Sequence, residues 1–214
     1  MKKQILFLAL LFTTFSTIAQ TSTTTAVNKE ERKVSFLVNS SLGFSKLKQD
    51  GNVTVNGNIS GIDAFINYNV AKNWSIASGV GLYEFNANTV LVGNSVSIKN
   101  SYLRIPLQVN GSFGVFNRDK VENQKIFFVF GVGVYANTLL KQEIETIIGN
   151  NIARNQGWNF GFSSQVGAKF ILSDELCLGL GVQSQNELTK MKKDGVSQKM
   201  IQTNAFYFSI AFNL

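Results

Sequence analysis

Large apolar side chains occupy every second position from Phe206 to Leu214, and small or polar side chains occupy the positions between them. Side chains of a β-strand point to opposite faces with a period of two, so this stretch predicts one strand with two unlike faces. Chain ends usually fray, yet the oily pattern runs to the last residue. The pattern indicates the closing strand of a transmembrane β-barrel, paired on both edges and facing lipid.

Seven earlier segments show the same alternation, with small or polar residues on the second face. Each is close to the roughly 9–11 residues that a tilted strand needs to cross a bilayer, and eight strands make the smallest bacterial barrels. We therefore expect an all-β, eight-stranded, antiparallel up-and-down transmembrane β-barrel. Its predicted strands cover residues 34–46, 59–70, 74–86, 97–116, 125–141, 157–172, 175–189 and 205–214.

The connections between these segments alternate in length. Short connections follow the second, fourth and sixth strands, at 71–73, 117–124 and 173–174; long ones follow the first, third, fifth and seventh, at 47–58, 87–96, 142–156 and 190–201. Bacterial barrels have short periplasmic turns and longer extracellular loops. The alternation predicts four long external loops, with the first strand beginning and the last strand ending on the periplasmic side.

The N-terminal segment has the organisation of an export signal. Lys2 and Lys3 precede an apolar run from Ile5 to Phe12, and the small residue Ala19 stands before Gln20. This arrangement predicts a cleaved secretory signal peptide at 1–19, because the apolar run is too short to span a membrane. Residues 20–33 are polar and without period, and predict a flexible periplasmic leader before a barrel at 34–214.

Composition restricts the chemistry that the chain can perform. Charged residues are 15% of the chain, below the roughly 25% of soluble domains, which fits a large uncharged surface. The chain has no His, so the Ser–His and Asp–His arrangements of hydrolytic barrels cannot form. The single Cys177 allows no intramolecular disulfide. We predict no enzymatic activity, no catalytic residues, no cofactor and no metal site.

Three charged residues are predicted on the lumen faces: Asp63, Arg104 and Lys169. An eight-stranded barrel is just wide enough for its side chains to fill it, and buried charges must be paired. We expect Arg104 to pair with Asp63 or with a tyrosine hydroxyl such as that of Tyr102. Pro106 also lies on the inward face, where its missing N–H predicts a local bulge or bend.

A basic segment lies near the chain's last strand. Residues 188–201 contain Lys190, Lys192, Lys193 and Lys199 against a single Asp194. On the outer face these lysines could bind lipopolysaccharide phosphates. The alternative is an ordinary hairpin tip with Asp194-Gly195 as its turn.

The run from Tyr102 to Leu107, together with the Ala-Gln ending of the signal peptide and the aromatic last strand, resembles the PorT-like outer-membrane β-barrel family of the Bacteroidota. The resemblance implies an eight-stranded barrel in the outer membrane of a Gram-negative bacterium. PorT itself is tied to type IX secretion. One departure is that the chain ends in Leu214, with the aromatic Phe212 two places earlier.

Taken together, the sequence predicts a small, monomeric, porin-like barrel with a structural, adhesive or envelope-assembly role through its external loops. The alternatives are an accessory of a secretion or envelope machine, a narrow channel or small-ligand binder, and a soluble lipocalin-like barrel. Expected partners are outer-membrane lipids and lipopolysaccharide, the barrel-assembly machinery through the C-terminal strand, and an envelope protein. No nucleic-acid partner is expected.

Overall fold

The computed structural model describes residues 33–49, 54–91, 94–115, 125–146, 149–153, 157–193 and 196–214. The chain divides into one unit of Met1–Glu31 and a second of Arg32–Leu214, and the second contains every strand reported below. The predicted signal peptide at 1–19 and nearly all of the leader at 20–33 lie outside the described residues. The described residues include no helix long and apolar enough to cross a membrane.

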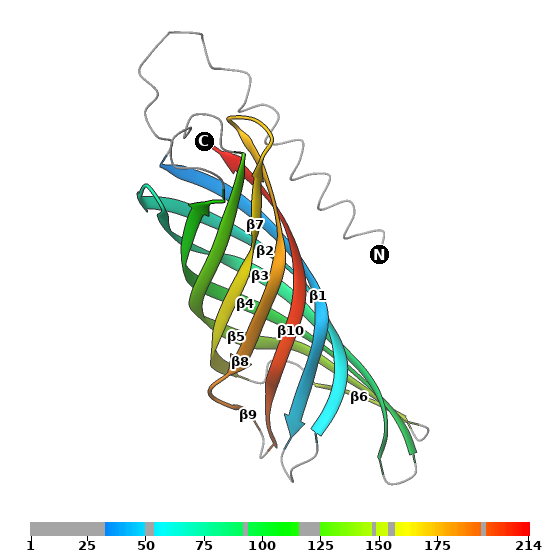
Figure 1. The fold of residues 1–214 in the computed structure, drawn as a ribbon. Coiled ribbons are helices and arrows are strands. Elements are labelled where there is room, and N and C mark those ends of the chain that lie inside the picture. Colours follow the sequence, from blue (N-terminus) through cyan, green and yellow to red (C-terminus); the bar gives the residue numbers. More distant parts are fainter. Residues whose placement is uncertain are drawn as a thin grey trace, which may run out of the picture. The chain divides into compact units, whose positions relative to one another are not determined.

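Eight long antiparallel strands form a closed ring in the order β1-β2-β3-β4-β5-β7-β8-β10, and β10 returns to pair with β1 (Figure 1). Two short strands extend this ring: β6 pairs with β5, and β9 pairs with β10. The predicted eight-stranded up-and-down barrel is confirmed. The strands are β1 (Val34–Gln49), β2 (Thr54–Ala71), β3 (Trp74–Leu91), β4 (Asn94–Gly114), β5 (Ile126–Thr146), β6 (Gly149–Ala153), β7 (Trp158–Ile171), β8 (Leu176–Glu187), β9 (Met191–Lys193) and β10 (Val196–Asn213).

The seam between β1 and β10 closes the ring as the sequence predicted. Phe36 is opposite Phe212 and Val38 is opposite Ile210, so the terminal strand pairs on both edges. Gly43 allows a close approach here, because a Cβ at this position would lie 2.0 Å from the Asn204 carbonyl oxygen. Closure leaves no open sheet edge, which a barrel in hydrocarbon requires.

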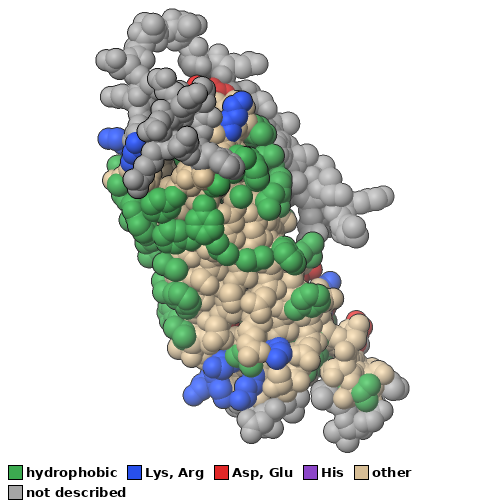
Figure 2. Space-filling model, viewed as in Figure 1, with side chains coloured by type: hydrophobic (Ala, Val, Ile, Leu, Met, Phe, Trp, Pro, Cys, Tyr) green, Lys and Arg blue, Asp and Glu red, His purple; other side chains and the backbone are tan. Residues whose placement is uncertain are grey.

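An apolar band covers the half of the barrel nearest the C-terminus on the face shown in Figure 2, and exposed large apolar residues lie on all eight long strands of the ring. On β1 it runs from Phe36 to Phe44 and stops where the exposed Lys46 begins; on β10 it runs from Phe212 to Phe206 and stops at Asn204. Nine residues of strand, at about 3.3 Å per residue and a tilt of about 40°, cover about 23 Å along the barrel axis. This height matches the hydrocarbon layer that such barrels span.

The strands continue well beyond this band, which corrects the predicted loops. Most of 47–58, 87–96 and 142–156 is paired strand, and β10 begins at Val196 inside the predicted loop 190–201. We call this extended end of the barrel the hairpin end, and the opposite end, where the Lys72-Asn73 turn lies, the turn end. The predicted external loops are therefore largely a β-wall that projects past the apolar band.

The face that carries apolar residues changes where the band stops. In β3, Ile76, Val80 and Leu82 face outward, whereas Phe85 and Ala87 toward the hairpin end are buried inside. The same change occurs in β2 and β4. The period of two is unbroken in these strands, but the medium outside the wall changes from lipid to water, so the apolar side chains turn inward.

Irregularities in pairing shift the inward face of two strands. A bulge between β1 and β10 places Gln202 at a φ of +51°, a left-handed conformation that is uncommon for a residue other than glycine. A second bulge, between β4 and β5, lies opposite Ser101 and Tyr102. Because a bulge inserts one residue, inward positions change from odd to even numbers, and Gln142 and Met200 become buried.

The bulge predicted at Pro106 is absent. The register between β3 and β4 is the same on both sides of Pro106, from Ser78 opposite Leu107 to Gly81 opposite Arg104. The proline only interrupts the ladder, and its carbonyl accepts a hydrogen bond of 2.9 Å from the Ser78 hydroxyl. This hydrogen bond gives the Pro106 carbonyl a partner, and no inserted residue is needed to accommodate the missing N–H.

Replacing Phe208 and Phe212 with Ser should block assembly of the barrel, because β10 both closes the ring and is expected to be the signal read by the assembly machinery. Folded protein in membrane fractions, measured by heat-modifiable gel migration, should fall at least tenfold. The matched control replaces Phe160 and Phe162 of β7, which are similarly exposed on the band. If the control variant fails to the same extent, general loss of apolar surface explains the effect and the terminal strand has no special role.

Candidate functional site

The middle of the lumen is organised around Arg104 of β4. Its guanidinium lies between two aromatic rings, 3.7 Å from the centroid of Tyr83 and 4.3 Å from that of Tyr135. It donates hydrogen bonds from Nη2 to Gln185 Oε1 at 2.6 Å and from Nε to Asn137 Oδ1 at 3.2 Å. A buried guanidinium favours this geometry, in which aromatic rings stack on both of its faces and its N–H groups donate hydrogen bonds in its own plane.

Two carboxylates lie on either side of this cation without bonding it directly. The Tyr83 hydroxyl donates to Asp63 Oδ2, while Asp63 Oδ1 has no hydrogen-bond partner. Glu187 accepts from Asn137 Nδ2 at 3.2 Å and from the backbone N–H of Met200. The predicted direct pairing of Arg104 with Asp63 or Tyr102 is therefore wrong: Tyr83 lies between Arg104 and Asp63, and Tyr102 instead accepts a bond from Asn100 Nδ2.

Glycines on the neighbouring strands make room for the large members of this network. The Tyr83 ring lies over Gly61, where a Cβ would be 2.3 Å from the ring, and the Tyr135 ring lies over Gly161 at 2.2 Å. Gly81 similarly leaves space for the Asp63 side chain, because a Cβ at this position would lie 2.0 Å from Asp63 Oδ1. Small inward residues thus relieve crowding between large side chains in a narrow barrel.

Together these residues form a cross-brace, which we define as Asp63, Tyr83, Arg104, Tyr135, Asn137, Gln185 and Glu187. They come from β2, β3, β4, β5 and β8, and the Met200 N–H adds β10, so the brace ties six strands of the ring. Within the brace, Asp63 Oδ1 is the one buried side-chain polar atom that lacks a hydrogen-bond partner. Such a network rigidifies a lumen and offers little room for passage.

An apolar plug fills the lumen on the hairpin side of the brace. Its side chains are almost wholly buried and come from seven strands of the wall and its extensions. Because the wall beyond the band faces water outside, these residues supply a core of the kind found in soluble proteins. The plug consists of Leu47, Val55, Ile59, Tyr83, Phe85, Ala87, Val96, Ile98, Tyr102, Leu139, Met191 and Met200.

The two bulges contribute residues to this region that the alternation of the sequence had hidden. Gln142 of β5 donates from Nε2 to Gln198 Oε1 of β10 at 3.1 Å, and both side chains are buried. Met200 joins the plug and its N–H reaches Glu187. Without the bulges, residues 142, 198 and 200 would fall on the outer face. No signal in the sequence marked the bulge at Gln202, which is not a glycine.

Other candidate groups lie apart from the brace. Lys169 faces the lumen as predicted, with Nζ 5.2 Å from the Phe127 ring centroid, toward the turn end. Cys177 is a free, buried thiol. Across the described ranges, no three His, Cys, Asp or Glu side chains gather so as to hold a metal ion. The interior chemistry that the structure does show is that of a structural core.

Replacing Arg104 with Met should lower the free energy of unfolding by about 3–5 kcal/mol, because two buried carboxylates lose their cation. A double-mutant cycle that combines Arg104→Met with Asp63→Asn should give a coupling energy of about 1–2 kcal/mol. When the same cycle is measured in protein that also carries Tyr83→Phe, the coupling energy should fall to half or less. Urea unfolding in lipid vesicles, followed by tryptophan fluorescence, measures these values. The control cycle pairs Asp63→Asn with Lys169→Met and should be additive. A coupling unchanged by Tyr83→Phe would show that Tyr83 does not relay the interaction.

The sequence and the fold are both similar to those of known outer membrane proteins. The outer membrane protein beta-barrel domain family matches residues 7–213. No curated protein matches the sequence. Among solved structures, Neisserial surface protein A is similar with a TM-score of 0.50 and 11% identity, over 84% of this chain and 97% of that one. A major outer membrane protein from Thermus thermophilus has a TM-score of 0.49 and 14% identity, over 84% of this chain and 98% of that one.

At these identities the solved structures show the fold alone, and the family assignment rests on the sequence match. That match covers almost the whole chain, including every strand of the closed ring. The apolar band, the closed ring and the inward brace are all properties of a barrel that spans the outer membrane. The chain belongs to the outer membrane protein beta-barrel domain family.

Proposed function

We propose that this protein is a non-conducting, non-enzymatic barrel whose role is structural, adhesive or in envelope assembly. The part of the β-wall that projects beyond the apolar band carries that role. In bacterial barrels the end with longer connections faces the outside, so the hairpin end is the extracellular one. The observation that carries the proposal is the combination of a filled lumen with a rigid, water-facing extension of the wall.

The filled lumen supports a role on the surface rather than in transport. The cross-brace spans the middle of the barrel, and the plug fills the lumen between the brace and the hairpin end. Leu47, Phe85 and Leu139 are fully buried in that plug. A solute entering from the outside would have to displace well-packed apolar side chains, which costs several kcal/mol.

The projecting wall supports a contact role. In β3 and β4, pairing continues in register from Asn86 opposite Lys99 out to Leu91 opposite Asn94, well past the band. The β5–β6 pair extends in the same way, from Gln142 opposite Ala153 to Thr146 opposite Gly149. Paired hairpins present side chains on a fixed frame, so less conformational entropy is lost when a partner binds.

The resemblance to PorT-like barrels supports a more specific version of the proposal, in which the contact partner is a component of a secretion or envelope machine. A pull-down from the native envelope separates this version from a purely structural or adhesive role. The expected state is a monomer, because the closed ring leaves no strand edge within the apolar band for another copy to pair with.

Wild-type protein in planar bilayers should give no stepwise current, because plug and brace obstruct the lumen. A variant with Phe85→Ala, Leu139→Ala and Arg104→Ala should show intermittent openings, since it removes bulk from both obstructions. Each preparation is first checked for heat-modifiable migration so that only folded barrels are compared. Regular unit steps from the wild type would contradict the non-conducting role.

Shortening the β3–β4 hairpin should abolish contact with an envelope partner and leave the barrel intact. The variant replaces residues 90–95 with Asn-Gly between Thr89 and Val96, which are paired in register, so that the plug residue Val96 is kept. Cross-linking in native envelopes followed by mass spectrometry should show the loss of proteins that the wild type captures. The matched control substitutes Lys72 in the short turn at the opposite end, and should capture the same proteins as the wild type. An identical set from the shortened variant would place the contact surface elsewhere.

A further inference from the structure

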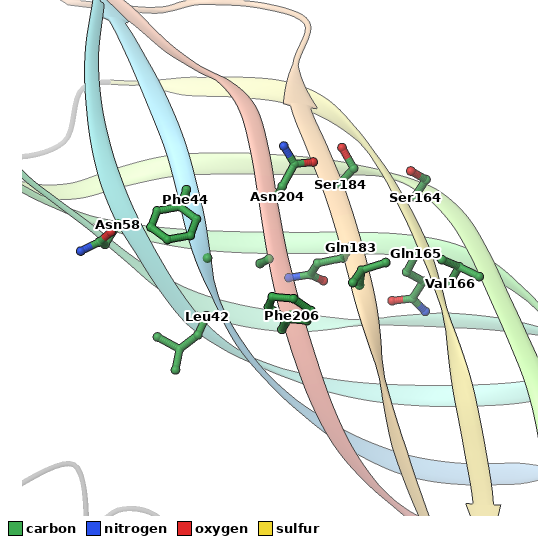
Figure 3. A pocket seen from close by; sticks show the side chains of 13 residues that line it. Leu42, Phe44, Asn58, Ser164, Gln165, Val166, Gln183, Ser184, Asn204 and Phe206 are labelled. Atoms are coloured by element: carbon green, nitrogen blue, oxygen red, sulfur yellow. The ribbon is translucent and has the colours of Figure 1, made fainter.

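The outer wall has a groove at the place where the apolar band stops on β1 and β10 (Figure 3). It has a volume of about 720 Å³ and crosses β1, β10, β8 and β7. Its floor follows one row of paired residues, Gly43, Ala205, Gln183 and Gln165. These floor residues turn their side chains to the lumen, so backbone and the flanking side chains shape the groove.

The two sides of this groove differ in chemistry. The side toward the turn end is the row Leu42, Phe206, Val182 and Val166, and these four residues are paired across neighbouring strands. The side toward the hairpin end is the row Phe44, Asn204, Ser184 and Ser164. On β1, β10 and β8 the groove therefore lies where apolar outward residues give way to polar ones, whereas on β7 the apolar outward residues continue past Ser164 to Phe162 and Phe160.

A second groove of about 860 Å³ adjoins the first on the hairpin side and shares three of its residues, Phe44, Asn58 and Asn204. Amide side chains dominate its lining, and all of them are exposed on the outer face. Amides carry both donors and acceptors, which suits the hydroxyl groups of a sugar. The amides are Asn56, Asn58, Asn86, Asn88, Gln202 and Asn204.

Lysines gather beside the amide groove. Lys46 lines it, and Lys48 lies directly opposite Lys199 in the β1–β10 pairing. Lys192 of β9 is also exposed, and Figure 2 shows basic side chains together at this end of the barrel. Like charges in directly opposite positions destabilise a sheet, so a bound anion would relieve this arrangement.

Acidic side chains do not balance this cluster within the described parts of β1, β2, β9 and β10. The one acidic residue there is Asp63, which faces the lumen and belongs to the brace. Of the four lysines in the predicted basic segment 188–201, Lys192, Lys193 and Lys199 lie on strands, and Lys190 directly precedes β9. The Asp194-Gly195 turn falls outside the described residues, between Lys193 and Val196, which are paired.

We propose that the two grooves and Lys46, Lys48 and Lys199 form one binding site for a phosphorylated glycolipid of the outer leaflet. An acyl chain lies along Leu42, Phe206 and Val182. The sugar occupies the amide groove, and a phosphate meets the lysines. The order of these three surfaces along the barrel axis is the order of the three parts of such a lipid. This site lies on the side of the wall; it rests on the proposed function only for its orientation, with the hairpin end outside, and needs neither the closed lumen nor an envelope partner.

The test compares two variants that each remove three positive charges. The site variant is Lys46→Gln, Lys48→Gln and Lys199→Gln; the control is Lys33→Gln, Lys72→Gln and Lys125→Gln, whose side chains are exposed at the turn end. Purified full-length barrel in detergent is titrated with lipid A carrying two phosphates, and with the same lipid after dephosphorylation. Native mass spectrometry measures the retained lipid.

Wild type and control should bind the bisphosphorylated lipid about 10- to 100-fold more tightly than the dephosphorylated lipid, as expected for three lysines near a membrane surface. The site variant should lose this preference. A variant with Asn58→Leu and Asn204→Leu should bind both lipids more weakly. The proposal would be overturned if the control variant lost the preference to the same extent, or if the wild type bound the phosphorylated and dephosphorylated lipids equally well. If the triple variant does not fold, the three single substitutions should each lower the preference in steps, and no decrease in any of them would equally overturn it.

Discussion

The medium that faces the outer wall changes once along each strand, and most of the structure follows from that change. Where the wall meets hydrocarbon, apolar side chains face outward and the lumen receives what is small or polar. Where the wall meets water, the hydrophobic effect favours the opposite arrangement, and the lumen receives Phe85, Ile98 and Leu139 instead. One uninterrupted β-wall therefore encloses a polar brace in one half and an apolar core in the other.

Brace and plug stabilise the barrel by different means. The plug resembles the core of a soluble protein and draws on buried apolar area. The brace places one guanidinium near two carboxylates with tyrosine and amide groups between them, so that opposite charges attract one another without close ion pairs. A direct buried ion pair would carry a large desolvation cost, and intermediate hydrogen-bonding groups spread that charge over several strands.

The sequence was sufficient to predict the strand number, the closing role of β10 and the lipid-facing rows, because a period of two is read directly from side chains such as Phe206 and Phe208. It failed beyond the band for a physical reason. There the apolar set moves to the other face, so polar outward positions such as Asn56 and Asn88 resembled a loop. The brace was only partly predictable, since Arg104 and Asp63 were found on inward faces, but Gln185 is contributed by a strand far along the chain.

The bulges were beyond prediction for a related reason. A one-residue insertion changes which face every later side chain occupies, and neither Gln202 nor Leu140 belongs to a residue type that marks such a site. Met200 was therefore assigned to no face, although its N–H bonds to Glu187.

The connectivity of the brace also bears on the order in which the barrel can form. Ser45 and Thr203, hydrogen-bonded across the seam at 2.7 Å, are 158 residues apart, and Arg104 and Gln185 are 81 residues apart. Contacts of such sequence separation form late, because loop closure must precede them. Until β8 and β10 have paired with the rest of the sheet, Arg104 lies on the face of an unclosed sheet and lacks its partner Gln185. A half-built barrel thus carries an exposed charge that hydrocarbon disfavours, and release into the bilayer becomes favourable only once the ring has closed.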